Sequence, residues 1–111
     1  MRYKIVIEYD GTPFVGWQRQ DNGLSVQECI ETAIESMFQE KSVLFGAGRT
    51  DAGVHATGQV AHFDIEHKEL DTYSIKTGLN HHLKIYPISV LDVTEVDAEF
   101  HSRFDAKERK Y

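Results

Sequence analysis

The sequence predicts one α+β domain of the ferredoxin-like type, a split βαβ sandwich in which two helices cover one face of an antiparallel sheet. The apolar residues alternate between a period of 2 and a period of 3.6, in the order β-α-β-β-α-β. The chain has 111 residues, the usual length of one domain. Its composition, 41% hydrophobic and 27% charged, is typical of a globular fold. Such a sandwich leaves the other face of the sheet partly free.

The first strand and helix have clear boundaries in the sequence. Residues 2–10 alternate apolar and polar side chains, which predicts a half-buried strand. A Gly-rich loop follows and ends at the turn signal Asn22-Gly23. Ser25 is expected to cap a helix of about four turns, with Glu28 completing a capping box. The buried stripe of that helix is Val26, Cys29, Ile30, Ala33, Ile34, Met37 and Phe38, with Glu28, Glu31, Glu35 and Glu40 away from it, as on a solvated outer face.

The later elements follow from the same patterns. We expect a strand over 42–48, a strand over 59–66, a helix that starts at Thr72 or Ser74, and a strand over 88–96. Ile75, Leu79 and Leu83 mark the buried face of the second helix. Residues 107–111 are expected to open a further strand.

Composition excludes several classes of protein. A single cysteine excludes an internal disulfide framework and a multi-cysteine metal site. The six histidines lack the spacing of a metal motif, so we expect no metal. No apolar run reaches the roughly 18–20 residues of a membrane helix, and acids interrupt the first apolar stretch, so a cytoplasmic protein is expected.

The net charge of −6 argues against a uniformly basic nucleic-acid-binding surface. The acids are, however, unevenly distributed. Three stretches, 28–40, 64–71 and 92–99, hold 12 of the 18 acids and only one base, Lys68. The rest of the chain carries an excess of positive charge, so an RNA partner is not excluded.

The most unusual segment is GAGRTDAGVHATGQVAHF, residues 46–63. It fits neither a phosphate-binding P-loop nor a dinucleotide-binding fingerprint. Arg49 and Asp51 are two residues apart, so on an extended chain they point the same way. A cation beside a carboxylate keeps it ionised, as a nucleophile or a base requires. A structural ion pair within a tight Gly-rich connection is the alternative interpretation.

Two further segments carry nucleic-acid-binding residue types. In YDGTPFVGWQRQ, residues 9–20, Arg19 is suited to phosphates and Gln18 to base edges, whereas Phe14 and Trp17 could simply close the core. In AEFHSRFDAKERKY, residues 98–111, basic side chains such as Arg103 alternate with aromatic ones. That combination suits single-stranded or flipped nucleotides, although basic chain ends are often merely solvated.

Together these segments, with SVQE at the first helix and Leu79-Asn80 in the second, resemble the bacterial tRNA pseudouridine synthase I family (TruA) across the whole chain. The resemblance implies that Asp51 is catalytic, that Arg49 pairs with it, and that Tyr111 stacks on the target base. It also implies isomerisation of uridine to pseudouridine in the anticodon arm of tRNA, without a cofactor or metal, by a homodimer. The uracil is detached, rotated and rejoined through carbon-5.

The chain departs from the family in two ways. Family members are roughly twice as long, with two similar halves and a cleft between them, so residues 1–111 are expected to be the N-terminal, aspartate-bearing half, with little activity alone. The connection around residues 84–88 looks one residue longer than is usual in the family.

Two other functions remain possible at this stage. A ferredoxin-like RNA-binding module without chemistry would use the free sheet face, and Arg49 and Asp51 would then be structural. A small acylphosphatase-like hydrolase would use Arg19 on the loop after the first strand, but it leaves GRTDAGVHA unexplained.

Overall fold

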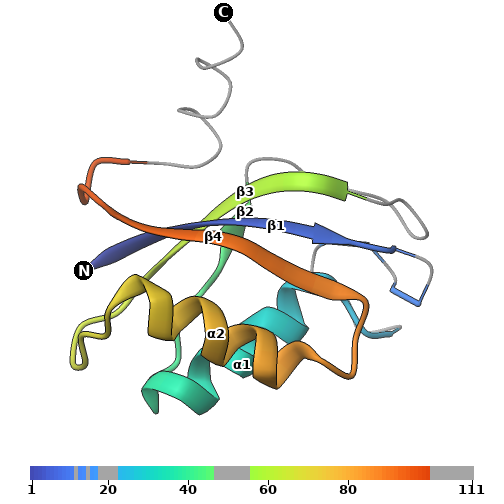
Figure 1. The fold of residues 1–111 in the computed structure, drawn as a ribbon, viewed down its shortest axis with the longest axis horizontal. Coiled ribbons are helices and arrows are strands. Elements are labelled where there is room, and N and C mark those ends of the chain that lie inside the picture. Colours follow the sequence, from blue (N-terminus) through green and yellow to red (C-terminus); the bar gives the residue numbers. More distant parts are fainter. Residues whose placement is uncertain (12, 15, 18–22, 47–55, 101–111) are drawn as a thin grey trace, which may run out of the picture.

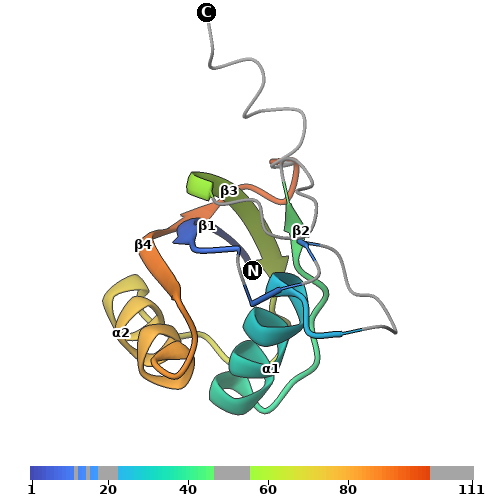
Figure 2. The same ribbon diagram turned by 90° about the vertical axis from the view of Figure 1, so that its right-hand side faces the viewer.

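The computed structural model describes residues 1–11, 13–14, 16–17, 23–46 and 56–100. In these ranges the order is β1 (Arg2–Tyr9), α1 (Val26–Phe38), β2 (Phe45–Gly46), β3 (Ala56–Asp64), α2 (Thr72–Leu83) and β4 (Ile88–Val96). The sheet order is β2-β3-β1-β4, and every neighbouring pair is antiparallel. Both helices cover the same face of the sheet (Figures 1 and 2). The predicted ferredoxin-like α+β sandwich is therefore confirmed.

The core lies between the helices and the sheet. Tyr3, Ile5, Ile7 and Tyr9 point from β1 toward the helices, each at most 4% exposed. The predicted stripe of α1 faces them, and all of it is buried except Met37, which is partly exposed and packs against the core. This agreement follows from amphipathic periodicity, because a helix on a sheet must bury one stripe of side chains.

The start of α1 is capped as the sequence predicts. The Ser25 hydroxyl accepts a hydrogen bond from the backbone N–H of Glu28 at 3.1 Å, and Ser25 is fully buried. The first turn of a helix has N–H groups without partners in the helix, and this contact satisfies one of them.

The strand predicted over 42–48 is shorter than expected, since β2 covers only Phe45–Gly46 in the described residues. The reason is that α1 side chains bind the backbone just before it. The Glu31 carboxylate accepts from the N–H of Leu44 at 2.9 Å, and the Gln27 amide donates to the Leu44 carbonyl at 3.2 Å. Glu31 is thus a structural acceptor, and its predicted place on a solvated outer face was wrong.

The strand β3 begins three residues earlier than predicted and contains a bulge. Ile7 pairs with Gln59 and Glu8 with Thr57, so Gly58 is the extra residue on β3. Its φ is +116°, a backbone conformation that glycine adopts without strain. A second irregularity lies between Val6 and Ile7 against β4. There the extra residue is Leu91 on β4, so both strands that flank the central strand β1 carry a bulge.

In the second half of the fold, side chains at the start of α2 and within it form hydrogen bonds with backbone groups. Asp71 caps α2 by accepting from the N–H of Ser74 at 3.1 Å. Within α2, Asn80 donates to the carbonyl of Val90 at 3.0 Å and accepts from its N–H at 2.7 Å, which fastens the helix to β4. Residues 84–87, where the sequence looked one residue longer, form turns, and the Tyr86 N–H donates to the Leu83 carbonyl at 2.8 Å. The strand expected over 107–111 lies outside the described residues.

We expect Glu31→Ala to destabilise the protein by about 1–3 kcal/mol, because it leaves the Leu44 N–H without its acceptor. Chemical denaturation measures the change. Glu35→Ala is the matched control, since Glu35 is an exposed residue one turn further along the same helix. Equal losses in the two variants would contradict the structural role of Glu31.

Stability should fall in acid. Hydrogen bonds from the backbone N–H groups of Glu66 and His67 lower the pKa of Glu40, and those from Ser74 lower the pKa of Asp71. A carboxyl whose pKa is lowered on folding stabilises the fold above its unfolded pKa, about 4, and loses that contribution as the pH falls through the folded value. The melting temperature should therefore be level from about pH 7 to 5 and decline below about pH 4. Glu40→Gln with Asp71→Asn should flatten that decline, and an unchanged slope would contradict it.

Candidate functional site

Two of the three segments selected from the sequence contain residues that pair with each other at one end of the sheet. Tyr9, the last residue of β1, pairs with Ala56, the first residue of β3. The loop after β1 and the connection from β2 to β3 therefore meet the sheet at neighbouring points (Figure 1). The antiparallel topology brings these segments together although they lie far apart in the sequence.

Trp17 connects the described parts of these two segments. Its indole is 3% exposed and stacks on Tyr9, with ring centroids 6.2 Å apart. Gly46 lies so close to it that a Cβ on Gly46 would be 2.8 Å from Cε2 and Cζ2 of the indole. Trp17 directly precedes residues 18–22 and Gly46 directly precedes residues 47–55. Residues 18–22 and residues 47–55 therefore each follow, in the sequence, one of two residues that are in contact with each other.

The same loop also caps α1. The N–H of Gln27 donates to the Trp17 carbonyl at 2.9 Å, and the N–H of Val26 donates to the Gly16 carbonyl at 3.2 Å. With Ser25, these acceptors satisfy three N–H groups in the first turn of the helix. Both the backbone and the ring of Trp17 are therefore fixed by the fold.

The third segment follows a turn on the sheet face opposite the helices. The Phe100 ring lies edge-on to His62 of β3, with centroids 6.0 Å apart, and His62 is 1% exposed. The guanidinium of Arg2 donates to the Phe100 carbonyl and to both carboxylate oxygens of Asp64. The hydrogen bonds from Arg2 hold the pKa of Asp64 below its usual range.

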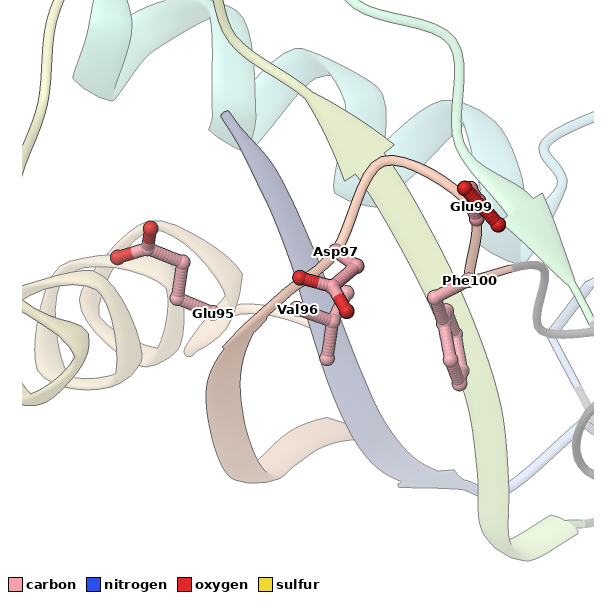
Figure 3. Close-up of a pocket in the computed structure, with 5 residues that line it drawn as sticks. All are labelled: Glu95, Val96, Asp97, Glu99 and Phe100. Atoms are coloured by element: carbon pink, nitrogen blue, oxygen red, sulfur yellow. The ribbon is translucent and has the colours of Figure 1, made fainter.

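A shallow depression beside this turn is unsuited to nucleic acid. It is lined by Glu95, Val96, Asp97, Glu99 and Phe100 (Figure 3). Three carboxylates line it, and carboxylates repel phosphate groups.

The described residues contain no group of three or more His, Cys, Asp or Glu side chains that is arranged to hold a metal ion. Cys29 is buried, and burial raises the pKa of its thiol to about 11, which keeps it protonated and unreactive at neutral pH. In the described part of the chain, no helix is both long and apolar enough to cross a membrane.

The site residues predicted from the sequence, Gln18, Arg19, Arg49, Asp51, Arg103 and Tyr111, all lie outside the described residues. The structure describes their neighbours instead. Phe14 and Trp17 are each 3% exposed, which confirms the core interpretation of these two side chains. Arg2 and Asp64 were not singled out from the sequence. They are 62 positions apart, so no local pattern indicated their pairing.

The fold and the framework define a ferredoxin-like sandwich whose sheet carries a Gly-rich Arg-Thr-Asp segment between its second and third strands. Comparison with known families gives the family itself. The model of a family described as tRNA pseudouridine synthase matches residues 5–105, nearly the whole chain. The chain belongs to this family.

Individual relatives of the chain bear the name of the same family. The chain is 55% identical to the tRNA pseudouridine synthase A of Anaplasma phagocytophilum (strain HZ), over all of this chain and 46% of that protein. It is 52% identical to the enzyme of the same name from Ehrlichia ruminantium (strain Welgevonden), and 55% identical to that of Wolbachia pipientis wMel, over all of this chain and 45% of each relative. The chain thus spans about half the length of these relatives.

We expect Gly46→Ala to displace Trp17, because the new methyl group meets a buried, rigid ring. Such overpacking costs about 1–3 kcal/mol. Trp17 is the sole tryptophan in the sequence, so its fluorescence should shift to longer wavelength.

The control is Gly78→Ala. There the new methyl group meets the end of the flexible Met37 side chain, and alanine favours a helix over glycine by about 1 kcal/mol. This variant should keep the wild-type emission and lose little stability. The same spectrum in Gly46→Ala as in wild type would contradict the role of Trp17 as a contact between the two segments.

Proposed function

We propose that this chain is the N-terminal, aspartate-bearing half of an enzyme that isomerises uridine to pseudouridine in the anticodon arm of tRNA. The observation that carries the proposal is the family match over residues 5–105, which includes the GRTDAGVHA segment and Asp51. The Trp17–Gly46 contact supports it, because it joins the framework of the two segments that carry Arg19 and Asp51.

In the proposed reaction the bond between ribose C1′ and uracil N1 breaks, and a bond between C1′ and C5 forms. The proton on C5 leaves and N1 gains one, so product and substrate are isomers and no cofactor is consumed. An ionised Asp51 attacks the base or the sugar carbon, or stabilises the positive charge that develops on the ribose. Arg49 keeps this carboxylate ionised. A base in a paired stem must first be flipped out, at a cost of about a few kcal/mol.

The remaining predicted residues are proposed to bind RNA. Arg19 and Arg103 contact phosphates, Gln18 reaches a base edge, and Tyr111 stacks on the flipped base. We further propose that the complete enzyme is a cytoplasmic homodimer whose two subunits each contact the tRNA. The charge distribution supports an RNA partner, since the chain outside the three acid-rich stretches 28–40, 64–71 and 92–99 carries 11 bases and six acids.

The test is a chimera in which this chain replaces the matching part of the Anaplasma phagocytophilum relative. We expect the chimera to release tritium from tRNA that contains 5-tritiated uridine, because C5 loses its proton. Asp51→Ala should lower the rate by at least about 1,000-fold, as loss of a catalytic carboxylate does elsewhere. The 111-residue chain alone should release little or none.

Asp51→Asn separates catalysis from binding. The substitution keeps the size of the side chain but removes its charge, so turnover should be lost while tRNA affinity stays within about threefold of wild type. A chimera that binds tRNA but never releases tritium would favour the alternative of an RNA-binding module without chemistry.

A further inference from the structure

The two helices form a layer whose outer side is covered by no other described element (Figure 2). The charges of this layer are divided between the helices. The charged residues of α1 are all acidic: Glu28, Glu31 and Glu35. Segment 72–91, which contains α2, has no acid, and its basic residues are Lys76, His81, His82 and Lys84. The layer is therefore acidic along one helix and basic along the other.

Contacts between the helices fix their alignment. Met37 of α1 packs directly on Gly78 of α2. Eight residues earlier in α1, Cys29 shares a side-chain hydrogen bond with Tyr86, eight residues after Gly78. The residue numbers fall along one helix as they rise along the other, so the helices are antiparallel and the end of α1 lies beside the start of α2.

This alignment makes the layer complementary to itself. Glu35 is level with the midpoint between Lys76 and Lys84, and all three side chains are exposed. A two-fold axis parallel to the helices, placed outside the layer, sets α1 of each copy on α2 of the other at the same level. Glu35 of one copy then lies between the two lysines of the other, about 6 Å from each along the helix axis. Opposite charges therefore face each other twice, once on each side of the axis.

Large exposed apolar side chains flank the same layer. Tyr73, at the start of α2, is 74% exposed, and Val43, shortly after α1, is 56% exposed. Val43 lines a depression at the end of α1, together with Glu31, Thr32, Glu35, Lys41 and Ser42. Because the start of α2 lies level with the end of α1, the same two-fold axis brings Tyr73 of one copy to this depression of the other. An aromatic side chain in a depression is a common anchor of protein interfaces.

We propose that the helix layer is a docking surface for a second copy of this chain, with α1 of each copy on α2 of the other. This inference rests on the homodimer of the proposed function and names the face that forms it. RNA is a poorer partner for the layer, because the charged residues of α1 are all acids. Exposed ion pairs are individually weak, so the charges set the orientation of the two copies and Tyr73 adds the apolar contact.

Charge reversal on each helix tests this pairing, with self-association measured by analytical ultracentrifugation of the 111-residue chain at low salt. Lys76→Glu with Lys84→Glu makes both helices acidic, and Thr32→Lys with Glu35→Lys makes the exposed part of α1 basic. Each double variant alone should associate at least about tenfold more weakly than wild type, because like charges then face each other. An equal mixture of the two should associate better than either alone, because every acidic face again meets a basic one.

Two single substitutions complete the experiment. Tyr73→Ala should weaken self-association by at least about tenfold without any change of charge. Lys4→Glu is the control for net charge, since Lys4 lies on the face of the sheet away from the helices, and it should leave self-association unchanged. The melting temperature establishes that each variant is folded.

A wild-type chain that stays monomeric over the whole concentration series overturns the proposal. So does a mixture of the two folded double variants that associates no better than either alone. Neither result bears on catalysis, which the tritium release of the chimera measures separately. If the chimera fails to release tritium while association responds to charge reversal as expected, the docking surface stands and the catalytic function fails.

Discussion

The contact between the Trp17 indole and Gly46 is the constraint on which the arrangement of the motifs depends. It requires glycine at position 46, because any side chain there would meet the ring. It also requires that the loop after β1 be fixed in place. The hydrogen bonds from the first turn of α1 to the Gly16 and Trp17 carbonyls fix it. The start of α1, the loop after β1 and the end of β2 are thus coupled, so a substitution that displaces one of them should displace the other two.

Several acidic side chains of this chain stabilise its fold. Glu31 and Glu40 accept backbone N–H groups from segments that the sheet does not pair, and Asp71 caps a helix. Asp64 orients the guanidinium that holds Phe100. The net charge of −6 is therefore a poor guide to the partner, because it includes these four of the 18 acids, which make contacts within the protein.

The sequence predicted those features that local patterns encode. The buried stripe and Ser25 cap of α1 were predictable because helix periodicity and capping depend on neighbours three or four residues away. The bounds of β4 were predicted correctly because the residue pattern of a strand is local as well. The short β2 was not predictable, since it depends on Glu31 of α1 reaching Leu44. Nor was the contact from Arg2 to Phe100, which joins residues 98 positions apart. The catalytic assignment of Asp51 comes from resemblance, and its side chain lies outside the described residues.

The bulge at Gly58 adds one residue to β3 and leaves the pairing on either side of it intact. Glu8 pairs with Thr57 before the bulge and Ile7 pairs with Gln59 after it, so Gly58 has no partner in β1. A bulge of this kind bends the strand and increases its local twist. Deleting Gly58 would therefore keep every pair of residues between β1 and β3 and straighten β3 near its start, so the direction of the strand there depends on a residue with no side chain.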